Sequence, residues 1–86
     1  MKNENFNLIK EFIYKLLYET INNNNITIKN NTLLNEELGL ESLDLIYICM
    51  KIEENYEISI EDTIVNSWTT VEDLITTTTK SLNKLV

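Results

Sequence analysis

The scarcity of glycine and proline is the feature that most constrains this chain, because Gly39 is its only glycine and it has no proline. Tight turns between strands draw heavily on these two residues, and a sheet protein of 86 residues needs several such turns. Helices joined by a few longer connections need far fewer. The sequence therefore predicts an all-α fold.

The length of the chain predicts a single domain spanning residues 1–86, because so short a sequence has material for one hydrophobic core. Its one thiol, Cys49, cannot form an internal disulfide, so nothing indicates an oxidising compartment. The first residues do not form the apolar stretch of a signal peptide, and no apolar run approaches the ~20 residues that span a bilayer. We therefore expect a cytoplasmic monomer that does not insert into membranes.

Histidine is absent from the chain, which limits its chemistry. Catalytic triads with a histidine base are excluded. A zinc site would have to consist of carboxylates and the thiolate of Cys49, which is an unusual donor set. We therefore expect no metal site and no catalysis that depends on a histidine base.

Acidic residues are concentrated in the middle of the chain. Residues 36–62 contain nine of them against Lys51 alone, a balance of −8 in a chain of net charge −7. Such a block repels nucleic acid and anionic lipid and attracts basic protein surfaces. It indicates either a solvated face that keeps the protein soluble or a protein-docking surface. In both cases we expect no nucleic-acid partner.

Apolar residues recur at three- and four-residue steps between Phe6 and Ile21, which predicts an amphipathic helix. Four consecutive asparagines, at 22–25, end it. Residues 22–41 then form a long connection that packs down through apolar anchors. The residues expected to be buried in these two segments are Phe6, Ile9, Ile13, Leu16, Leu17, Ile21, Ile26, Ile28, Leu33, Leu34 and Leu38.

Three further helices follow. The second is predicted from Ser42 to Tyr56. The Ser-x-x-acid pattern at 59–62 predicts a capping box for a short helix that ends at Val65, and the pattern Thr-x-x-Glu at 69–72 opens a last helix. That helix uses the apolar residues Val71, Leu74, Ile75, Leu82 and Leu85. The expected architecture is a small four-helix bundle with three main helices and one short helix.

The segment 38–44, Leu-Gly-Leu-Glu-Ser-Leu-Asp, resembles the attachment motif of acyl carrier proteins, Leu-Gly-x-Asp-Ser-Leu-Asp. Residues 53–60 resemble the acidic pair, aromatic residue and alternating aliphatics that follow the second helix in this family. Residues 68–74 resemble the threonine-capped start of its last helix. The three blocks align without a gap, so the resemblance covers nearly the whole chain.

The resemblance implies a carrier and not an enzyme. A phosphopantetheinyl transferase would move 4′-phosphopantetheine from coenzyme A to the hydroxyl of Ser42, and the terminal thiol of that arm would carry acyl intermediates as thioesters. Gly39 lets the backbone turn before the helix, whose N-terminus offers free N–H groups and a positive dipole end to the phosphodiester. A serine at such a junction is more often only an N-cap, and we expect Ser42 to have this role as well.

The second helix contains six consecutive apolar residues, at 45–50, more than one buried stripe requires. By the resemblance, Leu45, Ile48, Cys49, Ile52 and Tyr56 face the core and the remaining apolar residues face partner enzymes. An exposed apolar patch rimmed by charge is typical of docking surfaces. The apolar interior between the helices would cover the acyl chain. The predicted docking face consists of Glu41, Leu43, Asp44, Ile46, Tyr47, Met50, Glu53 and Glu54.

The sequence departs from the family pattern at Glu41, where aspartate is usual, at Tyr47, where fatty-acid carriers have glutamate, and at Glu61, where proline is common. The tryptophan at position 68 is a feature in which the chain resembles stand-alone carriers of amino-acid-activating systems. These departures leave room for a dedicated carrier in a specialised pathway. The implied partners are synthases, acyltransferases or adenylating ligases with basic docking surfaces, and the cargo is a fatty acyl, polyketide or aminoacyl (D-alanyl or peptidyl) group.

Two other classes of function stay open in the sequence. An unmodified interaction module could keep the carrier fold and use only its acidic face. A small hydrolase could use Ser42 with a lysine base, but Lys51, the nearest lysine in sequence, lies more than two helical turns away.

Overall fold

The computed structural model describes residues 2–23 and 25–83, and the regular secondary structure of these residues is helical. Its elements are α1 (Lys2–Ile21), α2 (Ser42–Tyr56), α3 (Asp62–Val65) and α4 (Val71–Asn83). The described residues contain one isolated antiparallel bridge, between Leu33 and Thr70, and no longer strand pairing. This confirms the all-α prediction of three main helices and one short helix, with α2 beginning and ending where the sequence indicated.

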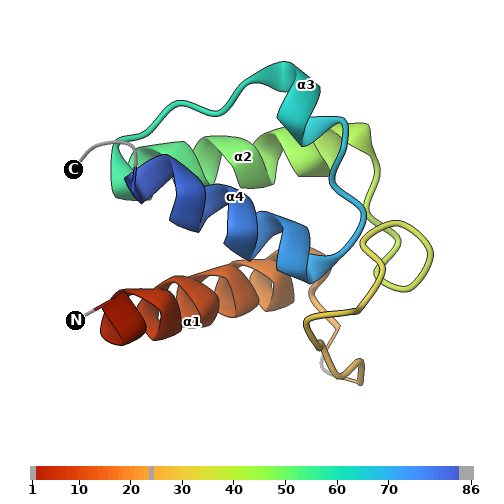
Figure 1. Ribbon diagram of the computed structural model, residues 1–86. Coiled ribbons are helices and arrows are strands. Elements are labelled where there is room, and N and C mark those ends of the chain that lie inside the picture. The colour runs from red at the N-terminus through yellow and green to blue at the C-terminus, as the bar shows by residue number, and fades with distance from the viewer. Residues whose placement is uncertain (1, 24, 84–86) are drawn as a thin grey trace.

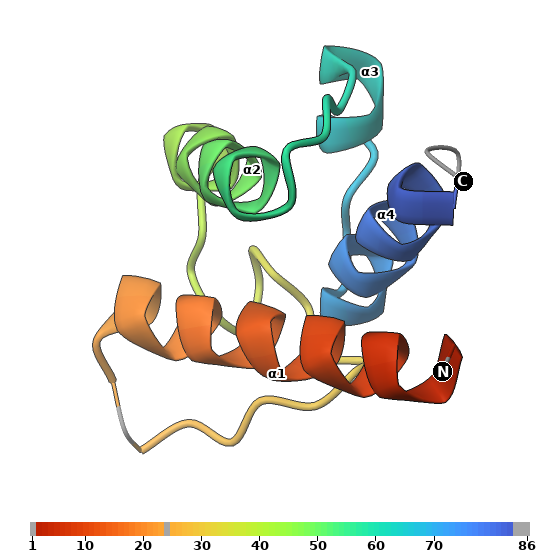
Figure 2. The ribbon, with the colours of Figure 1, turned by 90° about the vertical axis from the view of Figure 1, so that its left-hand side faces the viewer.

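Helices α1, α2 and α4 surround the core, and α3 lies beside α2 (Figure 1). In Figure 2, α2 is seen end-on above α1, with α3 and α4 together on the other side of the molecule. The core is one cluster, to which α1 contributes Ile9, Ile13, Leu16 and Leu17. Phe6 was wrongly predicted as buried. It is 42% exposed and lies in the N-terminal part of α1.

The connection between α1 and α2 packs against the rest of the molecule, as its apolar residues predicted. Ile28, Leu34 and Leu38 are buried, whereas Ile26 and Leu33 are half-buried. Backbone hydrogen bonds tie this connection to the start of α4, from Leu34 N–H to Thr69 O (2.9 Å), from Val71 N–H to Thr32 O (3.1 Å) and from Glu72 N–H to Asn30 O (2.8 Å). The long loop is thus a fixed part of the fold.

The predicted cap of α3 is wrong by two residues. The helix begins at Asp62, with Glu61 rather than Ser59 in the N-cap position. Ile60 lies in the loop before the helix, with its side chain buried and its N–H donating to Oε2 of Glu53 at 2.8 Å. A cap at Ser59 would place the Ile60 N–H in the first turn of the helix. In the structure this N–H instead attaches the loop to α2.

The cap of α4 lies one residue later than predicted. Val71 is the first helical residue, so the capping residue is Thr70 and not Thr69. The carboxylate of Asp73 accepts the N–H groups of Thr69 (2.8 Å) and Thr70 (3.0 Å), and Asp73 N–H lies 3.4 Å from Thr70 Oγ1. The acidic partner is Asp73 rather than Glu72. Val71, Leu74 and Ile75 are buried as expected, and Leu85 lies outside the described residues.

Candidate functional site

Ser42 is the first residue of α2, and it is exposed. The N-cap is Glu41, whose backbone is extended (φ −112°, ψ −179°), so the prediction that Ser42 caps the helix is wrong. The N–H of Glu41 donates to Oδ2 of Asp44 at 3.0 Å, and the first backbone bond of the helix runs from Leu45 N–H to Glu41 O at 3.0 Å. Because Glu41 and Asp44 cap the N-terminus of α2, the Ser42 hydroxyl is not needed for capping.

The backbone that leads to Ser42 is held by short-range hydrogen bonds. Gly39 has a φ of 70°, in the left-handed region that glycine adopts without steric cost. Its N–H donates to Asn35 O at 2.9 Å, and Leu40 N–H donates to Leu34 O at 3.0 Å. The side-chain amide of Asn35 donates in turn to Leu40 O at 2.8 Å. These bonds, with the buried Leu40 side chain, position the exposed serine on a fixed support.

Asn35 and Leu40 are two contributors that sequence reasoning missed. Leu40 lies at the variable position of the attachment motif, and nothing local indicates that it is 3% exposed. The bond from Asn35 to Leu40 O joins residues five apart across a turn, a separation that no simple sequence pattern marks.

The hollow beside Ser42 has a volume of about 580 Å³ and is lined by Asn35, Glu41, Ser42, Leu43 and Asp44. Two of these residues are carboxylates and none is cationic, so the hollow is poorly suited to bind a free phosphate. The N–H groups of the first helical turn precede the first intrahelical bond and would favour a phosphodiester attached to this end of the helix. An exposed hydroxyl, a helix N-terminus and open space fit a covalently attached 4′-phosphopantetheine whose arm extends into solvent.

Four large apolar side chains next to Ser42 face solvent, as predicted. Their exposed fractions are 79% for Leu43, 49% for Ile46, 47% for Tyr47 and 52% for Met50. The opposite stripe of α2 faces the core, with Ile48, Cys49 and Ile52 buried and Leu45 and Tyr56 half-buried. The assignment of the two stripes is confirmed, while the docking role of the exposed one stays a prediction.

The four acidic residues of the predicted docking face differ in their surroundings. Glu41 and Glu54 are exposed, whereas Asp44 and Glu53 are half-buried. The latter two carboxylates accept backbone N–H groups, Asp44 from Glu41 and Glu53 from Ile60. Asp44 and Glu53 therefore stabilise the helix start and the following loop in addition to any contact with a partner.

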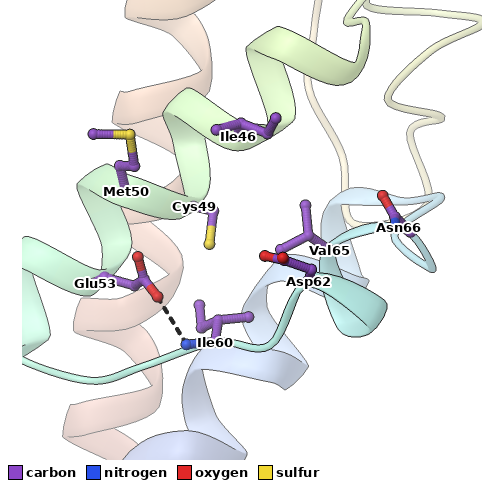
Figure 3. Close-up of a pocket in the computed structure, with 8 residues that line it drawn as sticks. All are labelled: Ile46, Cys49, Met50, Glu53, Ile60, Asp62, Val65 and Asn66. Carbon is purple, nitrogen blue, oxygen red and sulfur yellow. Dashed lines mark hydrogen bonds between the residues drawn. The ribbon is translucent and has the colours of Figure 1, made fainter.

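A groove of about 360 Å³ lies between α2 and the α3 region, and the close-up in Figure 3 shows its side chains. The Cys49 thiol points into it, flanked by carboxylates from both sides. Burial, followed by the charges of Glu53 and Asp62, raises the pKa of Cys49 to about 11, so the thiol is protonated at neutral pH. The lining residues are Ile46, Cys49, Met50, Glu53, Ile60, Asp62, Val65 and Asn66.

A hydrolase that uses Ser42 with Lys51 as its base does not fit the structure. The two residues are nine apart on one helix, about 13.5 Å at a rise of ~1.5 Å per residue. The ammonium of Lys51 instead lies 5.5 Å from the centroid of the Tyr47 ring.

Residues 2–23 and 25–83 contain no group of three or more His, Cys, Asp or Glu side chains that could bind a metal. Over the same residues, no helix combines the length and apolar character needed to cross a membrane.

Comparison with known proteins identifies the family. The family model described as the phosphopantetheine attachment site matches residues 11–77. The acyl carrier protein of Phytoplasma australiense is 32% identical over 75 residues, which cover 87% of this chain and 99% of that protein.

Solved structures of acyl carrier proteins have a similar fold. A crystal structure of an acyl carrier protein from Thermotoga maritima matches with a TM-score of 0.76 at 27% identity, over 91% of this chain and 94% of that one. The solution structure of the acetyl actinorhodin acyl carrier protein from Streptomyces coelicolor matches with a TM-score of 0.69 over 90% of this chain and 93% of that one. At 21% identity, this second match supports the fold alone.

Proposed function

The chain belongs to the acyl carrier protein family, and we propose that Ser42 is the residue that bears its 4′-phosphopantetheine group. When attached, this group supplies a terminal thiol on which acyl intermediates are carried as thioesters. The observation that carries the proposal is the exposed Ser42 hydroxyl at the first position of α2, between a hydrogen-bonded loop and a helix capped by other residues.

Attachment at Ser42 requires a phosphopantetheinyl transferase that binds coenzyme A. The Ser42 oxygen would attack the phosphorus nearest the pantetheine, the anhydride bond to the second phosphate would break, and adenosine 3′,5′-bisphosphate would leave as the hydroxyl proton is lost. Glu41 and Asp44 flank the serine, and their charges favour a transferase with basic groups or a metal ion at its active site. The chain itself supplies the acceptor and no catalytic residue.

The exposed face of α2 is the surface that we propose for docking of partner enzymes. It places the apolar side chains of Leu43, Ile46, Tyr47 and Met50 beside the predicted attachment serine, on a helix that also carries the acidic residues Asp44, Glu53 and Glu54. Partners with basic rims around an apolar contact would match this surface. Synthases, acyltransferases or adenylating ligases of a fatty-acid or polyketide-type pathway are the enzyme classes that we expect.

The groove between α2 and α3 is where we propose that the acyl chain lies between reactions. Ile46, Met50, Ile60 and Val65 supply apolar contacts there. The protonated Cys49 thiol is a weak nucleophile, so it would not compete for the thioester. A cytoplasmic location belongs to the same proposal, since this single cysteine is buried and unpaired by a disulfide.

The proposal is tested by loading the purified protein with coenzyme A and a promiscuous transferase. We expect the intact mass to rise by one phosphopantetheine group and Ser42→Ala to gain none. Ser67→Ala, at an exposed serine outside the motif, is the matched control and should load as the wild type does. Modification that persists in Ser42→Ala would overturn the assignment, and a wild type that never loads would favour an unmodified interaction module.

A further inference from the structure

A second groove lies on the other side of α2, where this helix packs against α1. Its volume is about 430 Å³. In Figure 2 this side of α2 is the one away from α3, above the C-terminal half of α1. We call it the lysine groove, and its lining residues are Phe12, Lys15, Leu16, Glu19, Tyr47, Lys51 and Asn55.

The lysine groove carries positive charge in an otherwise acidic molecule. Lys15 from α1 and Lys51 from α2 line it, with Glu19 as the single carboxylate among the lining residues. Lys51 is the only basic residue between positions 36 and 62, and its Nζ atom lies 5.5 Å from the Tyr47 ring centroid. Both lysines are exposed, so their ammonium groups are accessible to a partner.

The two grooves border the exposed face of α2 on opposite sides. Tyr47, Lys51 and Asn55 follow one another at four-residue steps, so they form one row along the helix. Ile46, Met50 and Glu53 line the other groove, to which α3 adds the carboxylate of Asp62. The face therefore has an acidic edge toward α3 and a cationic edge toward α1.

We propose that the lysine groove binds a carboxylate side chain of the enzyme that acylates this carrier, next to an apolar side chain of that enzyme packed on Phe12 and Tyr47. The occupant follows from charge complementarity and from continuity, because Tyr47 belongs both to this groove and to the exposed apolar face. The inference rests on the proposed carrier function and adds a second, oppositely charged contact to the docking of basic partner groups.

The consequence is a fixed orientation of the partner about the axis of α2. A partner whose surface is basic throughout would place cations against Lys15 and Lys51, and such like-charge contacts are unfavourable. A partner with basic groups toward α3 and an acidic group toward α1 matches both edges at once. Ser42 and the arm that it bears then face the enzyme in a single orientation.

The experiment measures acylation of tagged holo-protein in a clarified extract of the native cell, followed as the mass shift from holo to acyl form. The compared proteins are wild type, Lys15→Glu, Lys51→Glu and the charge-conserving Lys15→Arg and Lys51→Arg. Lys29→Glu and Lys80→Glu serve as controls, because both residues are exposed and lie outside either groove. All variants are loaded beforehand with a promiscuous transferase, and their melting curves are recorded.

At carrier concentrations below saturation of the enzyme, we expect acylation to slow about three- to tenfold in Lys15→Glu and in Lys51→Glu. Each change replaces one exposed ion pair with the enzyme by repulsion. The arginine variants keep the positive charge and should slow acylation much less than the reversals, and the two control reversals should keep the wild-type rate. Unchanged or faster acylation of Lys15→Glu and Lys51→Glu would overturn this inference and leave the carrier function in place. A loaded wild type that is never acylated would overturn the proposed function as well.

Discussion

Tyr47 is one of the residues at which the sequence departs from the pattern of fatty-acid carriers. It is 47% exposed, and Lys51 lies over its ring. We predict that Tyr47→Glu changes the free energy of unfolding by no more than ~0.5 kcal/mol, because surface substitutions have small effects and the new carboxylate lies four residues before Lys51. Thermal unfolding measures this. Ile48→Glu, at a fully buried neighbour, should lower the melting temperature by many degrees.

The same variant separates a specialised pathway from a housekeeping role. Tyr47→Glu restores the charge that fatty-acid carriers usually have at this position, so the holo-variant should become a better substrate for fatty-acid synthesis enzymes and a poorer one for the partners of this chain. Steady-state rates with purified fatty-acid synthesis enzymes measure the first effect. If the wild type already serves them fully and the variant gains nothing, the housekeeping role becomes the better hypothesis.

Cys49 allows a prediction about pH. Burial first, then Glu53 and Asp62, raise the pKa of its thiol from 9.0 to about 11, so at pH 8 the thiolate fraction is roughly 100-fold lower than for an unperturbed thiol. Alkylation by iodoacetamide, followed by mass spectrometry, should therefore be slow at pH 8 and accelerate toward pH 11. Since the unfolded state loses this proton more readily, stability should decrease as the pH rises from 9 to 11. Fast alkylation of the folded protein at pH 8 would contradict the burial.

At the scale of elements, Glu53 connects α2 to the loop before α3. Its carboxylate accepts the N–H of Ile60 at 2.8 Å, and both groups line the groove between α2 and α3. We predict that Glu53→Ala lowers the free energy of unfolding by ~1–2 kcal/mol, because a buried N–H loses a charged acceptor. Urea unfolding and amide hydrogen exchange at Ile60 measure the effect. Glu54→Ala, at the exposed neighbour, is the control and should change stability by less than ~0.5 kcal/mol.

The helix caps show what the sequence could predict and what it could not. Apolar periodicity located α1 because the helix must bury one face, and capping patterns located α3 and α4 although not their first residues. The predicted bounds of α2 match the structure. The caps of α3 and α4 depended on which nearby acid the backbone uses. Asp73, not Glu72, accepts the N–H groups of Thr69 and Thr70 just before α4, and the Ile60 N–H, two residues before α3, donates to Glu53 instead of opening a helix at Ser59. Local patterns cannot predict such choices, since tertiary contacts decide among equivalent candidates.

The positions and exposure of the candidate site residues were predictable to a similar extent, whereas their roles stay proposals. The motif indicated Ser42, and the doubled apolar surface of α2 indicated an exposed stripe, because a single core can cover only one side of a helix. The support under Ser42 was not predictable, since Asn35 and Leu40 act through contacts that form only when the loop closes. The lysine groove is also a tertiary feature, because Lys15 and Lys51 come together only when α1 packs on α2.

At the scale of the whole molecule, the described residues form one compact unit whose core leaves the outer face of α2 uncovered. The radius of gyration of the Cα atoms is 12.2 Å, close to the ~12 Å expected for a compact domain of this length. All the buried apolar residues belong to one cluster. The exposed apolar side chains of α2 therefore have no place in the interior, which supports the proposal that they become buried when a partner docks.

The charge of the molecule leads to a last prediction, which concerns salt. Residues 36–62 carry a balance of −8, and the Debye length falls from ~30 Å at 0.01 M to ~8 Å at 0.15 M ionic strength. At saturating coenzyme A, we expect kcat/KM of a phosphopantetheinyl transferase for the apo-protein to fall roughly tenfold over this range, because encounter with a basic partner is steered by charge. Glu54→Gln should lower the rate at low salt and flatten the dependence, whereas Glu72→Gln, exposed on α4, should change neither. A wild-type rate that does not depend on salt would mean that the acidic block contributes to solubility and not to docking.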